Sequence, residues 1–266
     1  MLRITLEGSI KSKLGKGKAI LVIGPRQVGK TTLIREILQE KAYLLLDGDI
    51  PLVRESLREP SLESLKSLLG NRQFVFIDEV QRIQNIGLTL KIIVDNFEGI
   101  QLMVSGSSAF GSNESINQPP TGRKWEYQLF PISWQELEGN EGHLSALQQL
   151  ENPLIFGSYP EVVNNPGDEI ELLIELTGSY LNKNILALGG IRKPEILEKI
   201  LWALAFQVGS EVSYNELSQL VGIRTPFPIT SICWSKVLLF FHSAASVEIF
   251  ETKSNPTKRS SFTIMA

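Results

Sequence analysis

Short runs of consecutive apolar residues recur along the first half of this chain, and stretches with helical spacing separate them. The apolar runs cover residues 19–23, 43–46, 74–77 and 102–104, and the last of these extends to a predicted strand over 101–104. Unbroken runs of this length are typical of strands that are buried on both faces of a sheet. Helices are predicted over residues 62–69 and 87–97. Because strand and helix alternate at this interval, the sequence predicts an α/β fold with a parallel sheet flanked by helices.

The first predicted strand runs directly into a glycine-rich loop and then into a helix. Gly24, Gly29, Lys30 and Thr31 fit the spacing G-x-x-x-x-G-K-[ST] without a gap. The glycines let the backbone fold back so that its amide groups point inward at a phosphate. Residues 33–38 continue as an apolar stripe at helical spacing, and the helix directs the positive end of its dipole at the same anion. The sequence therefore predicts a binding site for a nucleoside triphosphate.

The residues of this loop have different expected roles. Lys30 places a cation beside the outer phosphates, and the Thr31 hydroxyl is a candidate ligand for Mg²⁺. Arg26 is a further candidate for nucleotide contact, although side chains at such loop positions often point to solvent. The predicted nucleotide-binding residues are Gly24, Pro25, Arg26, Gln27, Val28, Gly29, Lys30, Thr31 and Thr32.

Two acidic residues follow the predicted strand at residues 74–77. Asp78 lies at its carboxyl end, where a carboxylate beside the loop can hold Mg²⁺, usually through water. The adjacent Glu79 is then placed to orient or deprotonate the water that attacks the γ-phosphate. The alternative is a strand that ends in two solvated carboxylates. The upstream phosphate loop favours the assignment of Asp78 to the metal and Glu79 to catalysis.

Four stretches, taken in order, carry a resemblance to a known family. They read GPRQVGKTTL, FIDEVQRI, LMVSGSSAF and TGRKWEYQLFPISWQEL, and they resemble a widespread group of bacterial and archaeal AAA+-type ATPases. The resemblance covers about residues 1–223. It implies a P-loop NTPase (AAA+-like) core followed by a winged-helix segment and a C-terminal domain of unknown function. It also implies ATP rather than GTP, since no guanine-reading Asn-Lys-x-Asp motif is present.

The resemblance also directs attention to Ser105 and Arg123. In AAA+ proteins a polar residue at the position of Ser105 senses the γ-phosphate, and Ser107 is an alternative residue for the same role. A serine in an ordinary Ser-Gly-rich turn explains the pattern as well. Arg123 matches a basic position that reaches a γ-phosphate in the same chain or from a neighbouring subunit, with a solvated surface arginine as the alternative. The candidate catalytic residues are Glu79, Lys30, Arg123 and Ser105, and the candidate metal ligands are Thr31 and Asp78.

The pattern changes after the predicted core, which residues 130–132 are expected to close as a last strand. Ser213 to Glu216 read as a capping box at the start of a helix, as in the first half of a winged helix-turn-helix. The predicted domains are a P-loop ATPase core at 1–132, a helical lid or connector at 133–191, the partial winged helix at 192–223 and a tail at 224–266.

The tail interrupts the expected motif. Pro226 and Pro228 disrupt the first turns of any recognition helix that would follow. Residues 224–266 hold seven serines, five basic residues and two acidic ones, whereas the whole chain has a net charge of −3. We therefore predict that the tail is read out of frame and poorly structured, so that the product lacks a complete winged helix. A divergent but genuine tail is the alternative.

Composition narrows the classes of function that remain. No apolar run approaches twenty residues, so a cytoplasmic protein without membrane contact is expected. One cysteine and two histidines exclude an internal disulfide and offer no zinc constellation. The sequence predicts an ATPase that hydrolyses Mg-ATP to drive or gate an unknown partner, DNA or protein, and it leaves the oligomeric state open. The alternatives are a slow ATP-gated switch that acts through the winged helix, and a truncated remnant that binds ATP without output.

Overall fold

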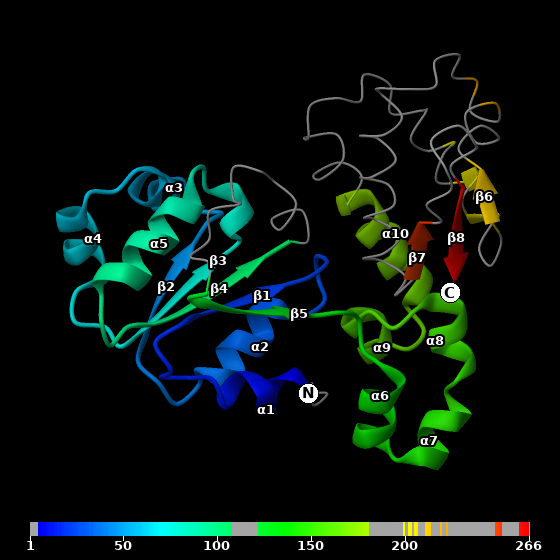
Figure 1. The fold of residues 1–266 in the computed structure, drawn as a ribbon. Helices are drawn as coiled ribbons and strands as arrows, with labels where there is room; N and C mark the ends of the chain where they lie inside the picture. Colours follow the sequence, from blue (N-terminus) through cyan, green and yellow to red (C-terminus); the bar gives the residue numbers. More distant parts are fainter. Residues whose placement is uncertain are drawn as a thin grey trace. The chain divides into compact units, whose positions relative to one another are not determined.

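The computed structural model describes residues 5–107 and 122–180, and beyond them only short pieces of the chain (Figure 1). These pieces are residues 199, 202–203, 205–206, 211–213, 219, 222, 248–251 and 261–265. The chain divides into two compact units, Met1–Pro160 and Glu161–Ala266, and each is described by itself.

The first unit is built on a parallel sheet of five strands in the order β2-β3-β4-β1-β5. The strands are β1 (Ala19–Ile23), β2 (Tyr43–Asp47), β3 (Phe74–Asp78), β4 (Gln101–Gly106) and β5 (Lys124–Gln128). Every residue of β1 and β4 is buried, as expected for strands with neighbours on both sides. The predicted parallel α/β sheet is therefore confirmed.

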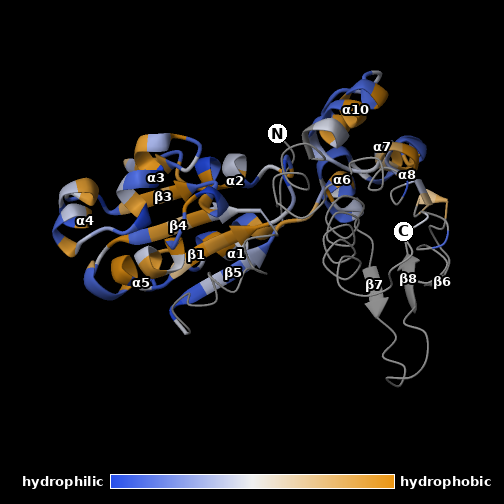
Figure 2. Ribbon diagram, turned by 90° about the horizontal axis from the view of Figure 1, so that it is seen from above, coloured by the Kyte–Doolittle hydropathy of each residue, from blue (hydrophilic) through white to orange (hydrophobic). Residues whose placement is uncertain are grey.

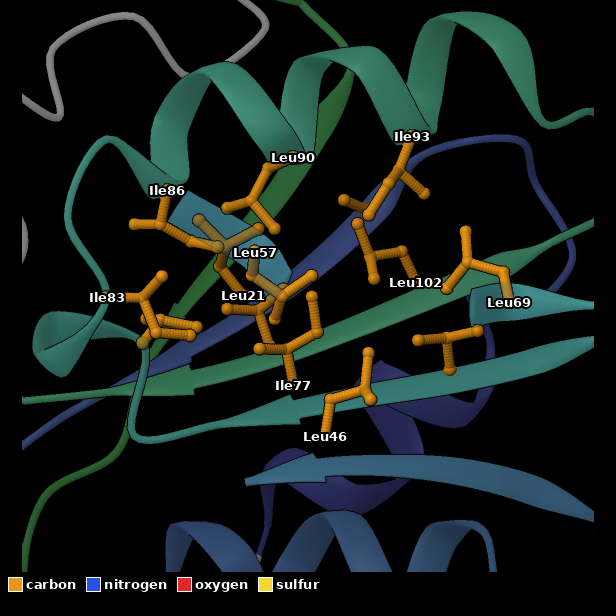
Figure 3. Packing of buried hydrophobic residues seen from close by; sticks show 14 of the residues in the cluster. Leu21, Leu46, Leu57, Leu69, Ile77, Ile83, Ile86, Leu90, Ile93 and Leu102 are labelled. Carbon is orange, nitrogen blue, oxygen red and sulfur yellow. The ribbon is translucent and has the colours of Figure 1, made fainter. Parts of the chain in front are cut away.

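Helices cover both faces of this sheet (Figure 1). On one face lie α3, α4 and α5, and on the other lie α1 and α2. Their bounds are α1 (Leu6–Lys11), α2 (Lys30–Ile37), α3 (Pro51–Arg58), α4 (Leu62–Leu69), α5 (Ile86–Asn96) and the 3₁₀ turn η1 (Val80–Arg82). The core under α3, α4 and α5 joins Leu57, Leu69 and Leu90 to strand residues such as Leu21 and Ile77, all of them buried (Figure 3). This core holds the strand ends, and hence the loops that follow them, in fixed positions.

The last strand of the sheet differs from the prediction. Residues 130–132 are not in a strand, and the edge is formed instead by β5, which pairs with β1 from Ala19 opposite Lys124 onwards. The sequence of β5 is KWEYQ, and none of its residues is fully buried. Figure 2 shows the contrast between the hydrophobic strands β1, β3 and β4 and the hydrophilic β5. An edge strand of this composition has no apolar run, which is why the sequence pattern missed it.

The predicted helical connector contains short helices wherever the structure describes it. They are α6 (Trp134–Glu141), α7 (His143–Gln148), α8 (Glu151–Phe156), α9 (Pro160–Asn164) and α10 (Glu169–Tyr180). Helix α6 begins with a capping box, since Ser133 accepts from the Glu136 amide and the Glu136 carboxylate accepts in return. Of the described helices, none has the length and apolar character that a bilayer crossing needs.

The second unit also contains an antiparallel sheet in the order β6-β8-β7. Its strands are β6 (Glu211–Ser213), β7 (Glu248–Glu251) and β8 (Ser261–Met265). Two of them fall within the predicted out-of-frame tail, whose other residues lie outside the described part of the chain. Ser213 ends β6, and residues 214–218 of the predicted capping-box helix also lie outside it. The domain boundaries and the change of reading frame stay predictions.

Candidate nucleotide-binding site

The loop between β1 and α2 has the backbone that its glycines predict. Gly29 adopts a left-handed conformation with φ 89°, and α2 begins at the next residue, Lys30. A Cβ at Gly24 would lie 2.2 Å from the carbonyl oxygen of Leu129, so no other residue fits there without a shift of the backbone. No side chain caps the amino end of α2, which leaves its first amide groups available to an anion.

Lys30 is buried within this loop, with 5% of its surface exposed. Its ammonium group donates hydrogen bonds to the carbonyl oxygens of Gly24, at 3.1 Å, and Pro25. The pKa of Lys30 is lowered to about 8, chiefly by burial and to a smaller extent by the positive charge of Arg26, while the negative charges of Glu79 and Asp78 oppose this shift. A buried ammonium group inside a glycine-rich loop can contact a polyanion that enters the loop, and the negative charges of Asp78 and Glu79 would then call for a cation such as Mg²⁺ beside that polyanion.

Asp78 is the point where three elements of the site meet. The Thr31 hydroxyl, at the start of α2, donates to Asp78 Oδ2 at 2.9 Å. The Ser105 hydroxyl, near the end of β4, donates to Asp78 Oδ1, as does the backbone amide of Glu79 at 3.0 Å. Asp78 and Ser105 are buried, at 6% and 0% exposure. The structure thus brings together Thr31, Asp78 and Ser105, which the sequence singled out separately.

Glu79 follows Asp78 in a left-handed backbone conformation, with φ 52°. Such a conformation is costly for a residue other than glycine and is held by its surroundings. Gly48 packs against it: a Cβ at position 48 would lie 2.6 Å from the carbonyl oxygen of Glu79. The Glu79 carboxylate accepts a hydrogen bond from the side-chain amide of Gln81. Sequence reasoning missed Gln81, and its only signal was an amide residue two positions after the acidic pair.

The other predicted loop residues differ in what they offer a ligand. Val28 is buried at 1% exposure and lies against Gly24, so only its backbone faces the loop. Gln27 and Thr32 are exposed, Arg26 is partly buried and Pro25 is buried. The loop therefore contributes chiefly backbone groups, together with the side chains of Lys30 and Thr31.

Arg123 lies away from these residues. It immediately precedes β5, and its carbonyl oxygen accepts from the backbone amide of Ala19 at the beginning of β1. Its guanidinium group forms an ion pair with Asp95 and is about half exposed. The loop at Gly24 follows the other end of β1, five residues and roughly 15 Å further along the strand. The structure does not bring Arg123 together with the other candidate residues of the same chain.

The donor set suits Mg²⁺. A hydroxyl group from Thr31 and a carboxylate from Asp78 are the hard oxygen ligands that this ion prefers. In the described part of the chain, no group of three or more His, Cys, Asp or Glu side chains could form a metal site by itself. A site with two protein oxygens fits an ion that is held mainly by phosphates and water.

Comparison with known proteins agrees with this geometry. Residues 16–138 match the family model of an AAA domain, and residues 147–227 match that of a domain of unknown function (DUF8612). Uncharacterized proteins of Mycobacterium tuberculosis and Mycobacterium bovis are each 33% identical over 86 residues, which are 32% of this chain and 19% of theirs. The matched region thus spans about a fifth of the length of these curated relatives.

The fold has a counterpart among solved structures. A Walker-type ATPase of Pyrococcus abyssi superimposes with a TM-score of 0.62 at 15% sequence identity, covering 99% of this chain and 93% of that one. At this identity the similarity establishes the fold alone. It confirms the α/β P-loop architecture that the apolar runs and the glycine spacing predicted.

Proposed function

We propose that this chain, which matches an AAA domain followed by a domain of unknown function, binds Mg-ATP and hydrolyses it to drive or gate a macromolecular partner. The observation that carries this proposal is the hydrogen-bonded cluster in which partly buried Thr31 and buried Ser105 both donate to buried Asp78, next to the glycine-rich loop. Buried polar side chains cost stability unless they bond one another, and here they bond at the place where a triphosphate would end.

The loop and Lys30 bind the triphosphate. Backbone amides of the loop and of the uncapped first turn of α2 would hold the phosphates, and the Lys30 ammonium group would supply a positive charge to the outer ones. The hydrogen bonds that Lys30 donates to Gly24 and Pro25 keep its ammonium group within the loop. Nucleotide binding is expected to exchange these carbonyl partners for phosphate oxygens, which are better acceptors because they are charged.

Mg²⁺ would be held by the Thr31 hydroxyl and, directly or through water, by the Asp78 carboxylate. The ion supplies positive charge that offsets the charge developing between the β- and γ-phosphates. Ser105 and the Glu79 amide each donate to Asp78, which fixes the orientation of its carboxylate. Ser105 therefore supports the metal site through Asp78 in addition to its proposed role beside the γ-phosphate.

Glu79 is the proposed catalytic carboxylate. Its charge acts on the pKa of Lys30, so the carboxylate lies within electrostatic reach of the phosphate loop. A carboxylate in this position can orient the attacking water and accept its proton, an effect worth roughly 10²- to 10⁴-fold in rate. A role for Arg123 then requires a neighbouring subunit, because within its own chain it lies at the other end of β1.

A slow ATP-gated switch is a second candidate. The match to a domain of unknown function at residues 147–227 includes the residues predicted to form a partial winged helix, which is a module that contacts DNA or protein. In this version the same site binds ATP and hydrolyses it slowly, and the output is a change in affinity for the partner. Salt-dependent binding of duplex DNA that changes with ATP would favour it.

The proposal is tested by phosphate release from Mg-ATP, measured for the wild-type chain, Lys30→Ala and Glu79→Gln. Matched controls are Lys66→Ala and Glu63→Gln, which alter exposed residues of α4. We expect both site variants to lose turnover and both controls to keep it. Only Lys30→Ala should also lose thermal stabilisation by ATP. Turnover that survives both site substitutions would refute the proposal. ATP stabilisation without turnover would favour the switch.

A further inference from the structure

The side-chain amide of Gln81 makes two hydrogen bonds, one through its nitrogen and one through its oxygen, and so connects two parts of the site. Its Nε2 donates to the Glu79 carboxylate, and its Oε1 accepts from the backbone amide of Ser107 at 3.0 Å. Ser107 directly follows β4, the strand that also carries Ser105. One partly buried glutamine therefore bridges the proposed catalytic carboxylate and the end of a neighbouring strand.

The turn that carries Gln81 is fixed independently of this bridge. Val80–Arg82 form η1, in which the Arg82 amide donates to the carbonyl oxygen of Glu79 at 3.0 Å. The Arg82 side chain forms an ion pair of 2.7 Å with Asp49, in the segment that follows β2. With the backbone held in this way, the Gln81 side chain is directed back at Glu79, the residue with the left-handed backbone.

The Gln81 amide satisfies both partners at once because it carries a donor and an acceptor on the same group. The Glu79 carboxylate requires a donor, and the Ser107 amide requires an acceptor. Glutamate at position 81 would keep the acceptor but repel Glu79, and methionine would fill the same space with neither group. A side chain whose donor and acceptor are both used is orienting its partners rather than merely filling space.

We infer that Gln81 is a positioning residue for catalysis: it holds the Glu79 carboxylate toward the nucleotide loop and ties it to the end of β4. The inference rests on the proposed function, since it assigns Glu79 the role of catalytic carboxylate. Both acidic residues are then linked to one strand, Asp78 through Ser105 and Glu79 through Gln81 and Ser107. A displacement of the end of β4 would therefore move both Asp78, the proposed metal ligand, and Glu79, the proposed catalytic carboxylate.

The first test compares Gln81→Met with Gln84→Met, a matched change at an exposed glutamine three residues further along. For Gln81→Met we expect kcat to fall about 10- to 100-fold with the KM for ATP changed less than about twofold, because a misplaced carboxylate affects the chemical step and not binding. Gln84→Met should match the wild type. A rise in KM with kcat unchanged, or no effect at all, would overturn the inference.

A double-mutant cycle separates positioning from a merely structural role. In the Glu79→Gln background, adding Gln81→Met should leave the single-turnover rate unchanged within about twofold, since the residue acts only through Glu79. An equal fractional loss in both backgrounds would show that Gln81 acts independently of Glu79, and the inference would fail.

A readout without turnover keeps the two proposals apart. In ¹⁵N-labelled full chain, the Ser107 amide should exchange its hydrogen faster in Gln81→Met than in Gln84→Met, because it loses its acceptor. The Gln81 side-chain amide signals should shift in Glu79→Ala. If these signals respond but the wild type has no ATPase activity, the bridge exists and the proposed function fails. If neither signal responds, the bridge is absent and this inference fails alone.

Discussion

The two edges of the parallel sheet carry polar residues in opposite ways. At the carboxyl edge, where the strands end, Lys30, Asp78 and Ser105 are buried, and Asp78 and Ser105 bond each other. At the amino edge, where the strands begin, the cations of Lys18 and Arg123 are at least partly exposed. The first arrangement removes charges from water, whereas the second leaves them hydrated.

The contacts at the amino edge are those of a stabilised surface. The ammonium groups of Lys13 and Lys18 lie 4.5 and 4.6 Å from the centre of the Trp125 ring. Gln101, buried at the start of β4, accepts from the Gly15 amide and donates to the Lys18 carbonyl oxygen, which fixes the loop between them. Charge alone therefore does not distinguish the nucleotide-binding site from the surface at the other end of the strands. Charge that is held out of water and shared between elements does.

The largest contrast is expected between two aspartates, one at each edge. Asp78→Asn removes the charge of the proposed metal ligand, and we expect turnover to fall roughly 10²- to 10³-fold. Asp95→Asn removes a partly exposed partner of Arg123, and turnover should stay within about twofold of the wild type. Phosphate release over a Mg²⁺ titration measures both. Equal effects of the two substitutions would erase the distinction between the edges.

The same substitution should change stability in opposite directions at the two edges. The lowered pKa of Lys30 means that folding raises the free energy of its charged form, relative to its neutral form, by roughly 3 kcal/mol. Lys30→Met also removes hydrogen bonds to two carbonyl oxygens, so we expect a net gain of about 1–2 kcal/mol without nucleotide. Lys18→Met, which loses a contact with Trp125, should cost up to about 1 kcal/mol.

Urea unfolding of the nucleotide-free chain at pH 7 measures both free energies. Lys30→Met should gain stability even as it loses ATP binding, a trade of stability for function that buried charges commonly show. Loss of stability in Lys30→Met would mean that its hydrogen bonds outweigh the cost of its burial.

Titration of Lys30 gives a pH-dependent prediction with a definite sign. Since the pKa is lowered to about 8 in the folded chain, about half of the Lys30 side chains are neutral at pH 8. The folded state binds fewer protons than the unfolded state above this pH, so this group makes stability rise as pH increases from about 8 toward the ordinary lysine pKa. Bound phosphates favour the ammonium form, so ATP binding at pH 8 should take up about half a proton.

Calorimetry of ATP binding in buffers of different ionisation enthalpy measures this uptake. Lys30→Arg is the matched control, because a guanidinium group stays protonated and should take up no proton at pH 8. The same uptake in both proteins would place the titrating group elsewhere.

Much of the carboxyl edge was predictable from the sequence, because it rests on local rules. The apolar runs located β1, β2 and β3 to within one residue, and the glycine spacing located the loop between Gly24 and Lys30. Acidic residues directly after an apolar run had to lie at a strand end, so Asp78 could be placed beside Thr31 before any contact was known. These inferences need only the alternation of strand and helix and the parallel direction of the strands.

What the sequence did not predict depends on non-local contacts. The strand β5 carries polar residues because it is the outermost strand of the sheet. Since it has no apolar run, the prediction placed the last strand at residues 130–132 instead. Because the predicted strand began about six residues too late, the sequence did not place Arg123 directly before the beginning of a strand, where the structure has it. The bridge by Gln81 could not be predicted either, since it depends on the path of η1 and on the end of β4.

The smallest expected effect concerns Arg123 itself. As half of a surface ion pair, it should contribute less than about 1 kcal/mol, so Arg123→Ala should unfold in urea nearly as the wild type does. In dilute solution its turnover should also stay within about twofold, because the guanidinium group lies at the other end of β1 from the loop. Lys124→Ala, which alters the next residue and another ion-pair cation, is the control.

The opposite outcome would assign Arg123 a role between subunits. If Arg123→Ala alone loses turnover by 10²-fold or more, and only at concentrations where the chain self-associates, the arginine acts on a neighbouring subunit's nucleotide. The amino edge of one subunit would then complete the carboxyl edge of the next.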